Sequence, residues 1–131
     1  MLIVDDDTVG GRALARYVYT NVRCPVRLVT GLAQLQFLLE HCSPATAVLL
    51  DYELGAGTSG IDAMHAIRAS GWGSACAFVT GAAHQLKNDL AHEAEQPPVF
   101  ARGGQVSHII GWVRHALGRG GSGTYPRMAR G

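Results

Sequence analysis

The chain begins with the stretch MLIVDDDTVGG, residues 1–11, in which a short apolar run ends in three consecutive acids. These acids, Asp5, Asp6 and Asp7, are three of only ten acids in the whole sequence. Two carboxylates about 4 Å apart repel one another by roughly 4 kcal/mol at an effective dielectric constant of about 20. Alternation along a strand turns neighbouring side chains apart, yet such a cluster stays costly unless a cation or a function offsets it.

Beyond this stretch, apolar runs of strand type alternate with amphipathic segments of helix type. The run TAVLLD, residues 46–51, is apolar until its final acid, which is typical of a buried parallel strand. The expected strands are residues 2–5, 25–30, 46–51, 75–80 and 98–102, and the expected helices are residues 7–22, 31–42, 61–71, 81–96 and 105–118. Strict alternation predicts an α/β fold, a doubly wound (βα)5 flavodoxin-like sandwich around a five-stranded parallel sheet.

The composition is that of one compact domain. Apolar residues make up 47% and charged residues 16% of the 131 residues, and the net charge is +1. This balance favours neither a nucleic-acid partner nor a membrane partner. We expect the domain to span residues 1–118 and to be followed by a flexible Gly- and Arg-rich tail, residues 119–131.

The three cysteines, Cys24, Cys42 and Cys76, are odd in number and widely spaced. Their spacing argues against a disulfide framework or a zinc site and predicts reduced, mostly buried thiols in a cytoplasmic protein. No stretch approaches the roughly 20 apolar residues that cross a bilayer.

Several polar residues stand at the carboxyl ends of the expected strands, where ligands bind in doubly wound sheets. They are Asp5 and Asp6, Asp51, Thr80 and Arg102. Two acids from the first strand and one from the third meet at one rim of the sheet. This arrangement predicts a site for a divalent cation.

In order and spacing, these residues resemble those of the receiver domain of two-component response regulators, the CheY-like domain. The resemblance extends from residue 2 to about residue 117. It implies that a histidine kinase or a phosphotransfer protein donates a phosphoryl group to Asp51 in a Mg²⁺-dependent reaction and that the domain then changes conformation. It also implies a phosphorelay role in the bacterial cytoplasm, with no catalysis on an external substrate.

The resemblance assigns a role to each site residue. Asp6 and Asp51 would bind Mg²⁺ directly, together with the backbone carbonyl of Glu53, and Asp5 would act through a bound water or as an outer acid. Thr80 would donate a hydrogen bond to a phosphoryl oxygen.

The same resemblance assigns Arg102 as the cation on the phosphate side. It also implies that another receiver or an effector docks on the surface formed by residues 81–96, 98–102 and 105–118. Both a free-standing receiver and a piece of a hybrid kinase or multidomain regulator remain open.

Three positions depart from the family's usual pattern. Arg102 stands where lysine is usual, Gly103 stands where a cis proline is usual, and the aromatic switch position falls on Val99. Phe100 is adjacent to Val99 but is expected to point to the opposite face of the strand. These changes motivate an alternative, in which the chain is a degenerate receiver that binds partners without being phosphorylated.

Two further motifs suggest other enzymes. DDDTV, residues 5–9, matches the nucleophile motif of haloacid-dehalogenase-like phosphatases, with Asp5 as the nucleophile and Asp7 as the general acid. Such an enzyme needs another acidic pair near its last strands, which residues 98–104 lack, and a cap of the helix at 7–22 is the preferred role of Asp7. GAGTSG, residues 55–60, matches a dinucleotide-binding pattern but is better explained as a loop over the metal site.

Overall fold

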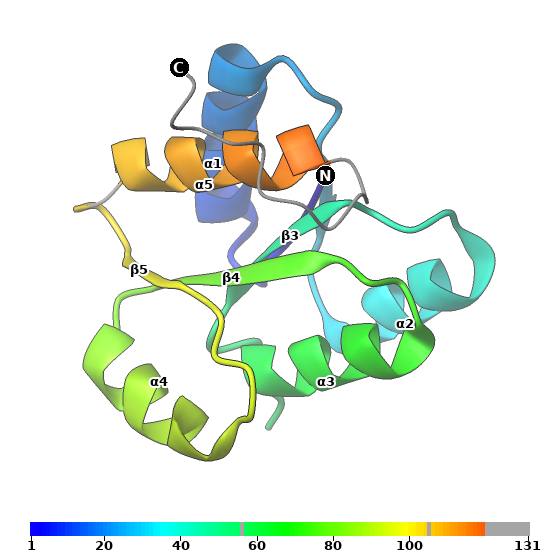
Figure 1. Cartoon of the computed structure of the whole chain (residues 1–131), viewed down its shortest axis with the longest axis vertical. Helices are drawn as coiled ribbons and strands as arrows, with labels where there is room; N and C mark the ends of the chain where they lie inside the picture. Colours follow the sequence, from blue (N-terminus) through cyan, green and yellow to red (C-terminus); the bar gives the residue numbers. More distant parts are fainter. Residues whose placement is uncertain (56, 105, 120–131) are drawn as a thin grey trace.

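The computed structural model of the chain describes residues 1–55, 57–104 and 106–119 (Figure 1). The strands are β1 (Leu2–Val4), β2 (Arg27–Val29), β3 (Ala47–Asp51), β4 (Ala75–Thr80) and β5 (Val99–Ala101). The helices are α1 (Thr8–Val22), α2 (Leu32–His41), α3 (Gly60–Ser70), α4 (Ala83–Asp89), α5 (Val106–Arg119) and a short 3₁₀ helix, η1 (Leu90–His92). Strands and helices alternate as predicted.

The five strands form one parallel sheet in the order β2-β1-β3-β4-β5. Val4 of β1 lies opposite Leu50 of β3, and Asp51 lies opposite Val79 of β4. The carboxyl ends of these three neighbouring strands therefore meet at one edge of the sheet. The predicted doubly wound fold is confirmed.

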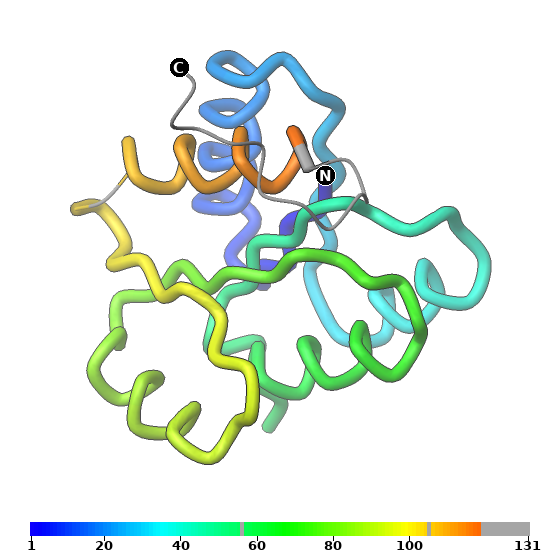
Figure 2. The backbone as a smooth tube through the Cα atoms, in the orientation of Figure 1, coloured from blue at the N-terminus to red at the C-terminus, as the bar shows by residue number. Residues whose placement is uncertain are grey.

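Helices cover both faces of the sheet, with α1 and α5 on one face and α2, α3 and α4 on the other (Figures 1 and 2). Each face has its own apolar core, because the strand side chains alternate between the two sides. The core beneath α1 and α5 includes Ile3, Leu49, Val79 and Ile109. The core beneath α2, α3 and α4 includes Val4, Leu50, Met64 and Phe78.

Local sequence signals determine where α1 and α3 begin, at the edge where the carboxyl ends of the strands meet. Asp7 precedes α1, and its Oδ1 accepts hydrogen bonds from the backbone N–H groups of Val9 and Gly10, at 3.1 and 3.2 Å. The predicted cap is therefore confirmed. Helix α3 begins with a capping box in which Ser59 and Asp62 bond each other's backbone N–H groups, and it ends at Gly71, whose φ is +83°.

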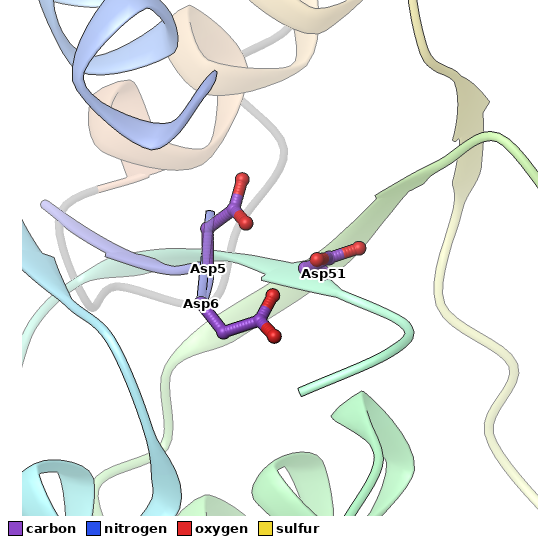
Figure 3. Close-up of side chains that lie close together, drawn as sticks. All are labelled: Asp5, Asp6 and Asp51. Atoms are coloured by element: carbon purple, nitrogen blue, oxygen red, sulfur yellow. The ribbon is translucent and has the colours of Figure 1, made fainter. Parts of the chain in front are cut away.

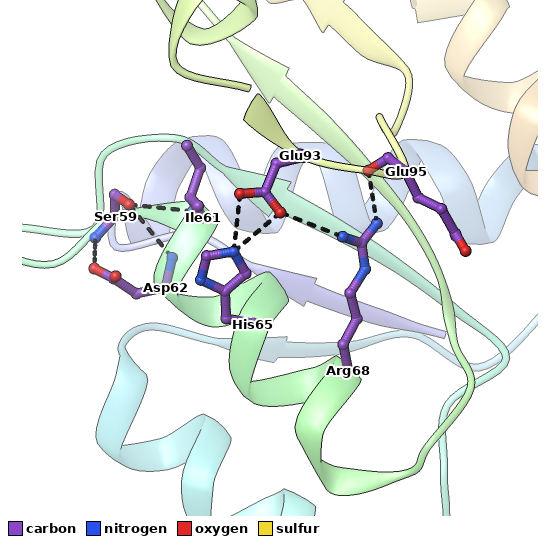
Figure 4. A network of polar contacts seen from close by, with 7 residues as sticks. All are labelled: Ser59, Ile61, Asp62, His65, Arg68, Glu93 and Glu95. Atoms are coloured by element: carbon purple, nitrogen blue, oxygen red, sulfur yellow. Dashed lines mark hydrogen bonds and ion pairs between the residues drawn. The ribbon is translucent and has the colours of Figure 1, made fainter. Parts of the chain in front are cut away.

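The prediction of one long helix over residues 81–96 is wrong. Helix α4 ends at Asp89, η1 ends at His92, and the backbone of Glu93 is extended. Prolines at positions 97 and 98 disfavour helical geometry just before them. Side chains of α3 hold this non-helical segment in place (Figure 4): His65 contacts Glu93 at 3.1 Å, and Arg68 donates to the carbonyl of Glu95 at 3.2 Å.

The prediction of mostly buried thiols is also wrong. All three cysteines are free, but only Cys76 is buried, whereas Cys24 is half-buried and Cys42 is exposed. Cys42 follows the last residue of α2 and so lies beyond the apolar face of that helix.

Two other expectations concern the C-terminal tail and membrane-spanning segments. Residues 120–131 of the predicted tail lie outside the described residues. Within the described part of the chain, no helix combines the length and the apolar character that crossing a membrane requires.

Candidate functional site

Three carboxylates converge where β1 and β3 end (Figure 3). Asp5 and Asp6 directly follow β1, and Asp51 is the last residue of β3. Each of the three offers a carboxylate oxygen, and these oxygens all lie within 4.8 Å of one another. The structure thus brings together the three acids that the sequence places at the strand ends.

The three acids differ in their exposure to solvent. Asp5 is buried, with 3% of its side chain exposed, the side chain of Asp51 is 14% exposed, and Asp6 is exposed. The backbone N–H of Asp7 donates to Oδ1 of Asp5 at 2.9 Å, which holds the buried carboxylate in place. The exposure of Asp51 is therefore intermediate between that of buried Asp5 and that of exposed Asp6.

This environment makes the ionised form of Asp51 costly. The pKa of Asp51 is raised from 3.8 to about 7, and burial is the largest cause. The charge of Asp5, a hydrogen bond to Asp5 and, more weakly, the charge of Asp6 contribute to this rise, whereas the charge of Arg102 opposes it. A carboxylate in such a position is stabilised by a nearby cation.

Arg102 supplies one positive charge to the cluster. Its Nη2 lies 3.5 Å from Oδ2 of Asp5 and 3.3 Å from Oδ1 of Asp51, with 37% of the side chain exposed. Its backbone N–H donates to the carbonyl of Thr80 at 2.9 Å, which continues the pairing of β4 and β5 as far as the site. The predicted cation at position 102 is therefore at the acidic cluster.

Two glycines lie near this arginine. Gly103 has a φ of +82°, which proline cannot adopt because its ring holds φ near −65°. A Cβ atom at Gly10 would lie 3.5 Å from Nη1 of Arg102 and only 2.8 Å from Oδ2 of Asp7. A side chain at Gly10 would thus crowd the capping carboxylate of Asp7, whereas its contact with Arg102 would be an ordinary one.

Thr80 and Val99 occupy neighbouring strands. Thr80 ends β4, is buried, and its Oγ1 accepts from the backbone N–H of Ala82 at 3.0 Å. Val99 packs against the core beneath α2, α3 and α4, whereas Phe100 packs on the α1 and α5 side. The expected opposite orientation of Phe100 is confirmed.

Glu53 is exposed and is not part of the cluster of carboxylates. Its backbone forms a bridge with Ser59 that closes the loop before α3. In this loop Gly55 has a φ of +74°, and a Cβ atom there would lie 3.2 Å from Oδ2 of Asp6. Gly55 therefore lies beside the acidic cluster, in the loop that precedes α3.

The sequence did not predict a hydrogen bond between Tyr52, the residue after Asp51, and α4. The hydroxyl of Tyr52, a buried residue, donates a hydrogen bond to the carboxylate of Asp89 at the end of α4. No spacing rule pairs residues 37 positions apart. The only available signal was a tyrosine directly after a strand, because a buried tyrosine hydroxyl needs a partner.

The donor set fits a hard divalent cation. It consists of carboxylate oxygens only, and cations such as Mg²⁺ and Ca²⁺ prefer oxygen ligands. The cluster is thus consistent with divalent metal binding, with the charge of Arg102 as a competitor for Asp5 and Asp51.

The comparisons with known proteins point to one fold. No family model and no curated protein matches the sequence. Among solved structures, the chain resembles a CheY-like response regulator receiver domain protein from Methanospirillum hungatei JF-1, with 17% identity and a TM-score of 0.76 over 90% of this chain and 92% of that chain. It also resembles the PhyR response regulator REC domain of Erythrobacter litoralis, with 23% identity and a TM-score of 0.73 over 88% of this chain and 87% of that chain.

A third similar structure is a response regulator from Burkholderia pseudomallei, which was crystallised with a phosphorylated aspartic acid, a calcium ion and citrate. The identity is 21% and the TM-score is 0.64 over 83% of this chain, which spans 62% of that longer chain. These similarities are to signalling domains, and together with the sheet order they show that this chain has the fold of a response regulator receiver domain.

Proposed function

We propose that the chain is a phosphoacceptor receiver domain in which Asp51 accepts a phosphoryl group from a histidine kinase or a phosphotransfer protein. The observation that carries the proposal is the convergence of Asp5, Asp6 and Asp51 within 4.8 Å at the edge where ligands bind in this fold. Arg102 beside Asp51 adds the positive charge that an incoming phosphoryl group requires.

The chemistry is a nucleophilic displacement at phosphorus. A carboxylate oxygen of Asp51 forms the new P–O bond as the P–N bond of the donor's phosphohistidine breaks, and the electron pair of that bond stays on the imidazole. Asp51 is suited to this attack because its carboxylate is partly exposed, whereas that of Asp5 is buried. The product is an aspartyl phosphate.

A magnesium ion fits the acids around the nucleophile. We assign Asp6, Asp51 and the backbone carbonyl of Glu53 as its direct protein ligands and Asp5 as an outer acid. When bound, Mg²⁺ would neutralise the crowded carboxylates and the incoming phosphate.

Two further side chains are assigned to the phosphoryl group. The oxygen of Thr80 accepts from the backbone of Ala82, so its O–H proton is available for a phosphoryl oxygen. Arg102 donates to another phosphoryl oxygen through its planar fork, which is longer and more directional than a lysine ammonium. We assign the surface of α4, β5 and α5 as the place where another receiver or an effector docks.

A second function is supported by the departures around β5. Val99 offers no ring or hydroxyl, and the +82° φ of Gly103 gives the loop after Arg102 a path that proline cannot follow. Both features favour a module that binds partners through the receiver fold without a phosphorylation switch.

Incubation with Mg²⁺ and acetyl phosphate, followed by intact mass measurement, separates these functions. We expect one added phosphoryl group on the wild type and on Asp7→Asn, whose asparagine still caps α1. We expect none on Asp51→Asn or after removal of the metal with EDTA. A wild type without an adduct would favour the binding module.

A further inference from the structure

Helix α4 is short and buries one of its own residues. It is the shortest of the five α-helices in the described residues. Leu86 is its buried residue, Leu90 is buried directly after its end, and its N-cap residue, Ala82, has no side chain that can bond the first turn. A helix of two turns is marginal by itself, so its position depends on tertiary ties.

Two such ties join the ends of α4 to residues at the carboxyl edge of the sheet. At the start, the backbone N–H of Ala82 donates to Oγ1 of Thr80, the last residue of β4. At the end, the carboxylate of Asp89 accepts from the hydroxyl of Tyr52, which follows Asp51 directly in the chain. Both ends of the helix are thus tied to residues next to the phosphoryl site.

The side chain and the backbone of Tyr52, the residue after Asp51, are both held in place. Its side chain is 8% exposed and belongs to the same apolar core as Leu86 and Leu90. Its carbonyl accepts a hydrogen bond from the backbone N–H of Gly60 at 2.6 Å, which ties the peptide after Asp51 to the start of α3. Tyr52 is therefore fixed both by its buried side chain and by its backbone, directly beside Asp51.

The side chains of Val99 and Phe100 in β5 do not offer an equivalent hydrogen bond to α4. Val99 faces the core on the α4 side but has no polar atom in its side chain, and Phe100 packs on the opposite side of the sheet. Among the described residues, Tyr52 is the aromatic side chain that joins the site edge to α4 by a hydrogen bond.

We propose that the hydrogen bond between Tyr52 and Asp89 couples the state of Asp51 to the position of α4. This inference rests on the proposed phosphoacceptor function. With the bond in place, α4 has one preferred position in the unmodified protein and another after Asp51 is phosphorylated. Without it, the end of α4 is untethered in both states, so the difference between them disappears.

Hydrogen exchange of residues 83–92, measured with and without Mg²⁺ and acetyl phosphate, tests the coupling. Tyr52→Phe removes only the hydroxyl, and Asp89→Ala removes only the acceptor. We expect both variants and the double variant to take up the phosphoryl group as the wild type does. We also expect all three to lose the phosphorylation-dependent change in exchange to the same extent, because they remove one shared bond.

Two controls separate the bond from other effects. Asp89→Asn keeps an acceptor oxygen and is expected to retain the exchange response, which a purely ionic role of Asp89 would not permit. Tyr17→Phe, on the surface of α1, is the matched tyrosine control and is expected to behave as the wild type.

The intact mass of each sample distinguishes the two levels of failure. No adduct on the wild type would contradict the proposed function, and the coupling with it. An adduct on the wild type without any change in exchange at α4 would overturn the coupling alone. So would an unchanged response in Tyr52→Phe and Asp89→Ala.

Discussion

At the scale of single residues, the site depends on a gradient of exposure across three acids. Asp5 is buried and bonded to the backbone, Asp6 is exposed, and Asp51 lies between them. A nucleophile has to be open on one side to meet its partner, yet burial on the other side raises the cost of its charge. A nearby positive charge lowers this cost, and the guanidinium of Arg102 supplies part of that charge.

Asp51 is expected to make the stability of the metal-free protein depend on pH. Its pKa is near 3.8 in the unfolded chain and about 7 in the folded state, and burial is the largest cause of this rise. The folded state thus holds the proton more tightly, so the free energy of unfolding falls as the pH rises from about 4 to about 7. Urea unfolding in EDTA across this range measures the slope.

The matched variant for this prediction is Asp51→Asn, which cannot titrate. We expect its free energy of unfolding to decrease less over the same pH range than that of the wild type. Equal slopes for the two proteins would show that Asp51 is not the group responsible.

Arg102 is expected to compete with a bound divalent cation. Its guanidinium contacts Asp5 and Asp51, and removal of its charge takes away a like-charge repulsion of about 1 kcal/mol at this degree of exposure. Titration calorimetry should therefore show that Arg102→Ala binds Mg²⁺ several-fold more tightly than the wild type. Arg16→Ala, an exposed arginine of α1, is the control.

Unchanged or weaker Mg²⁺ binding by Arg102→Ala would contradict this competition. For phosphorylation, Arg102→Lys is expected to retain the adduct, because lysine keeps the positive charge. If Arg102→Ala equals the wild type in both metal binding and phosphoryl uptake, residue 102 has no role at the site.

At the scale of elements, the turn from β3 to α3 brings the start of α3 close to Asp51 at the end of β3. Gly60, the first residue of α3, makes this approach feasible. A Cβ atom there would lie 2.2 Å from the carbonyl oxygen of Asp51 and 2.7 Å from the ring of Phe78. Neither neighbour is the end of a flexible side chain, so the backbone of Asp51 would have to move.

Gly60→Ala is therefore expected to lower the free energy of unfolding by about 2–3 kcal/mol. Gly111→Ala is the control, because a Cβ atom in that part of α5 meets nothing within 4 Å and alanine favours a helix by about 1 kcal/mol. Chemical denaturation of the two variants measures the contrast. A Gly60→Ala protein as stable as the wild type would contradict the close approach.

Sequence reasoning was strongest where one local signal decides an element. The apolar runs gave the five strands, and Asp7 and Gly71 marked helix ends through their own side-chain and backbone chemistry. It failed after α4, where the local effect of Pro97 and Pro98 acts together with contacts from distant residues, His65 and Arg68 of α3.

The site shows the same division. Parallel strands bring their carboxyl ends together, so the meeting of Asp5, Asp6 and Asp51 follows from the topology alone. The double contact of Arg102 and the bond between Tyr52 and Asp89 depend on rotamers and packing, which no pattern along the chain encodes.

At the scale of the whole molecule, the order β2-β1-β3-β4-β5 places β1 and β3 side by side at the centre of the sheet. This order brings the acidic pair after β1 next to Asp51, although Asp51 lies 45 positions after Asp6 in the chain. The receiver fold therefore accounts for why the acids meet, and the proposed chemistry accounts for why a fold would retain so costly a cluster.

The position of the phosphoryl group tests the central claim most directly. After incubation with Mg²⁺ and acetyl phosphate, borohydride reduction marks the acyl phosphate, and tryptic peptides locate the mark. Cleavage after arginine places Asp5, Asp6 and Asp7 in residues 1–12 and Asp51 in residues 28–68. We expect the mark at Asp51 in the second peptide, and a mark at Asp5 in the first peptide, or no mark at all, would contradict the account.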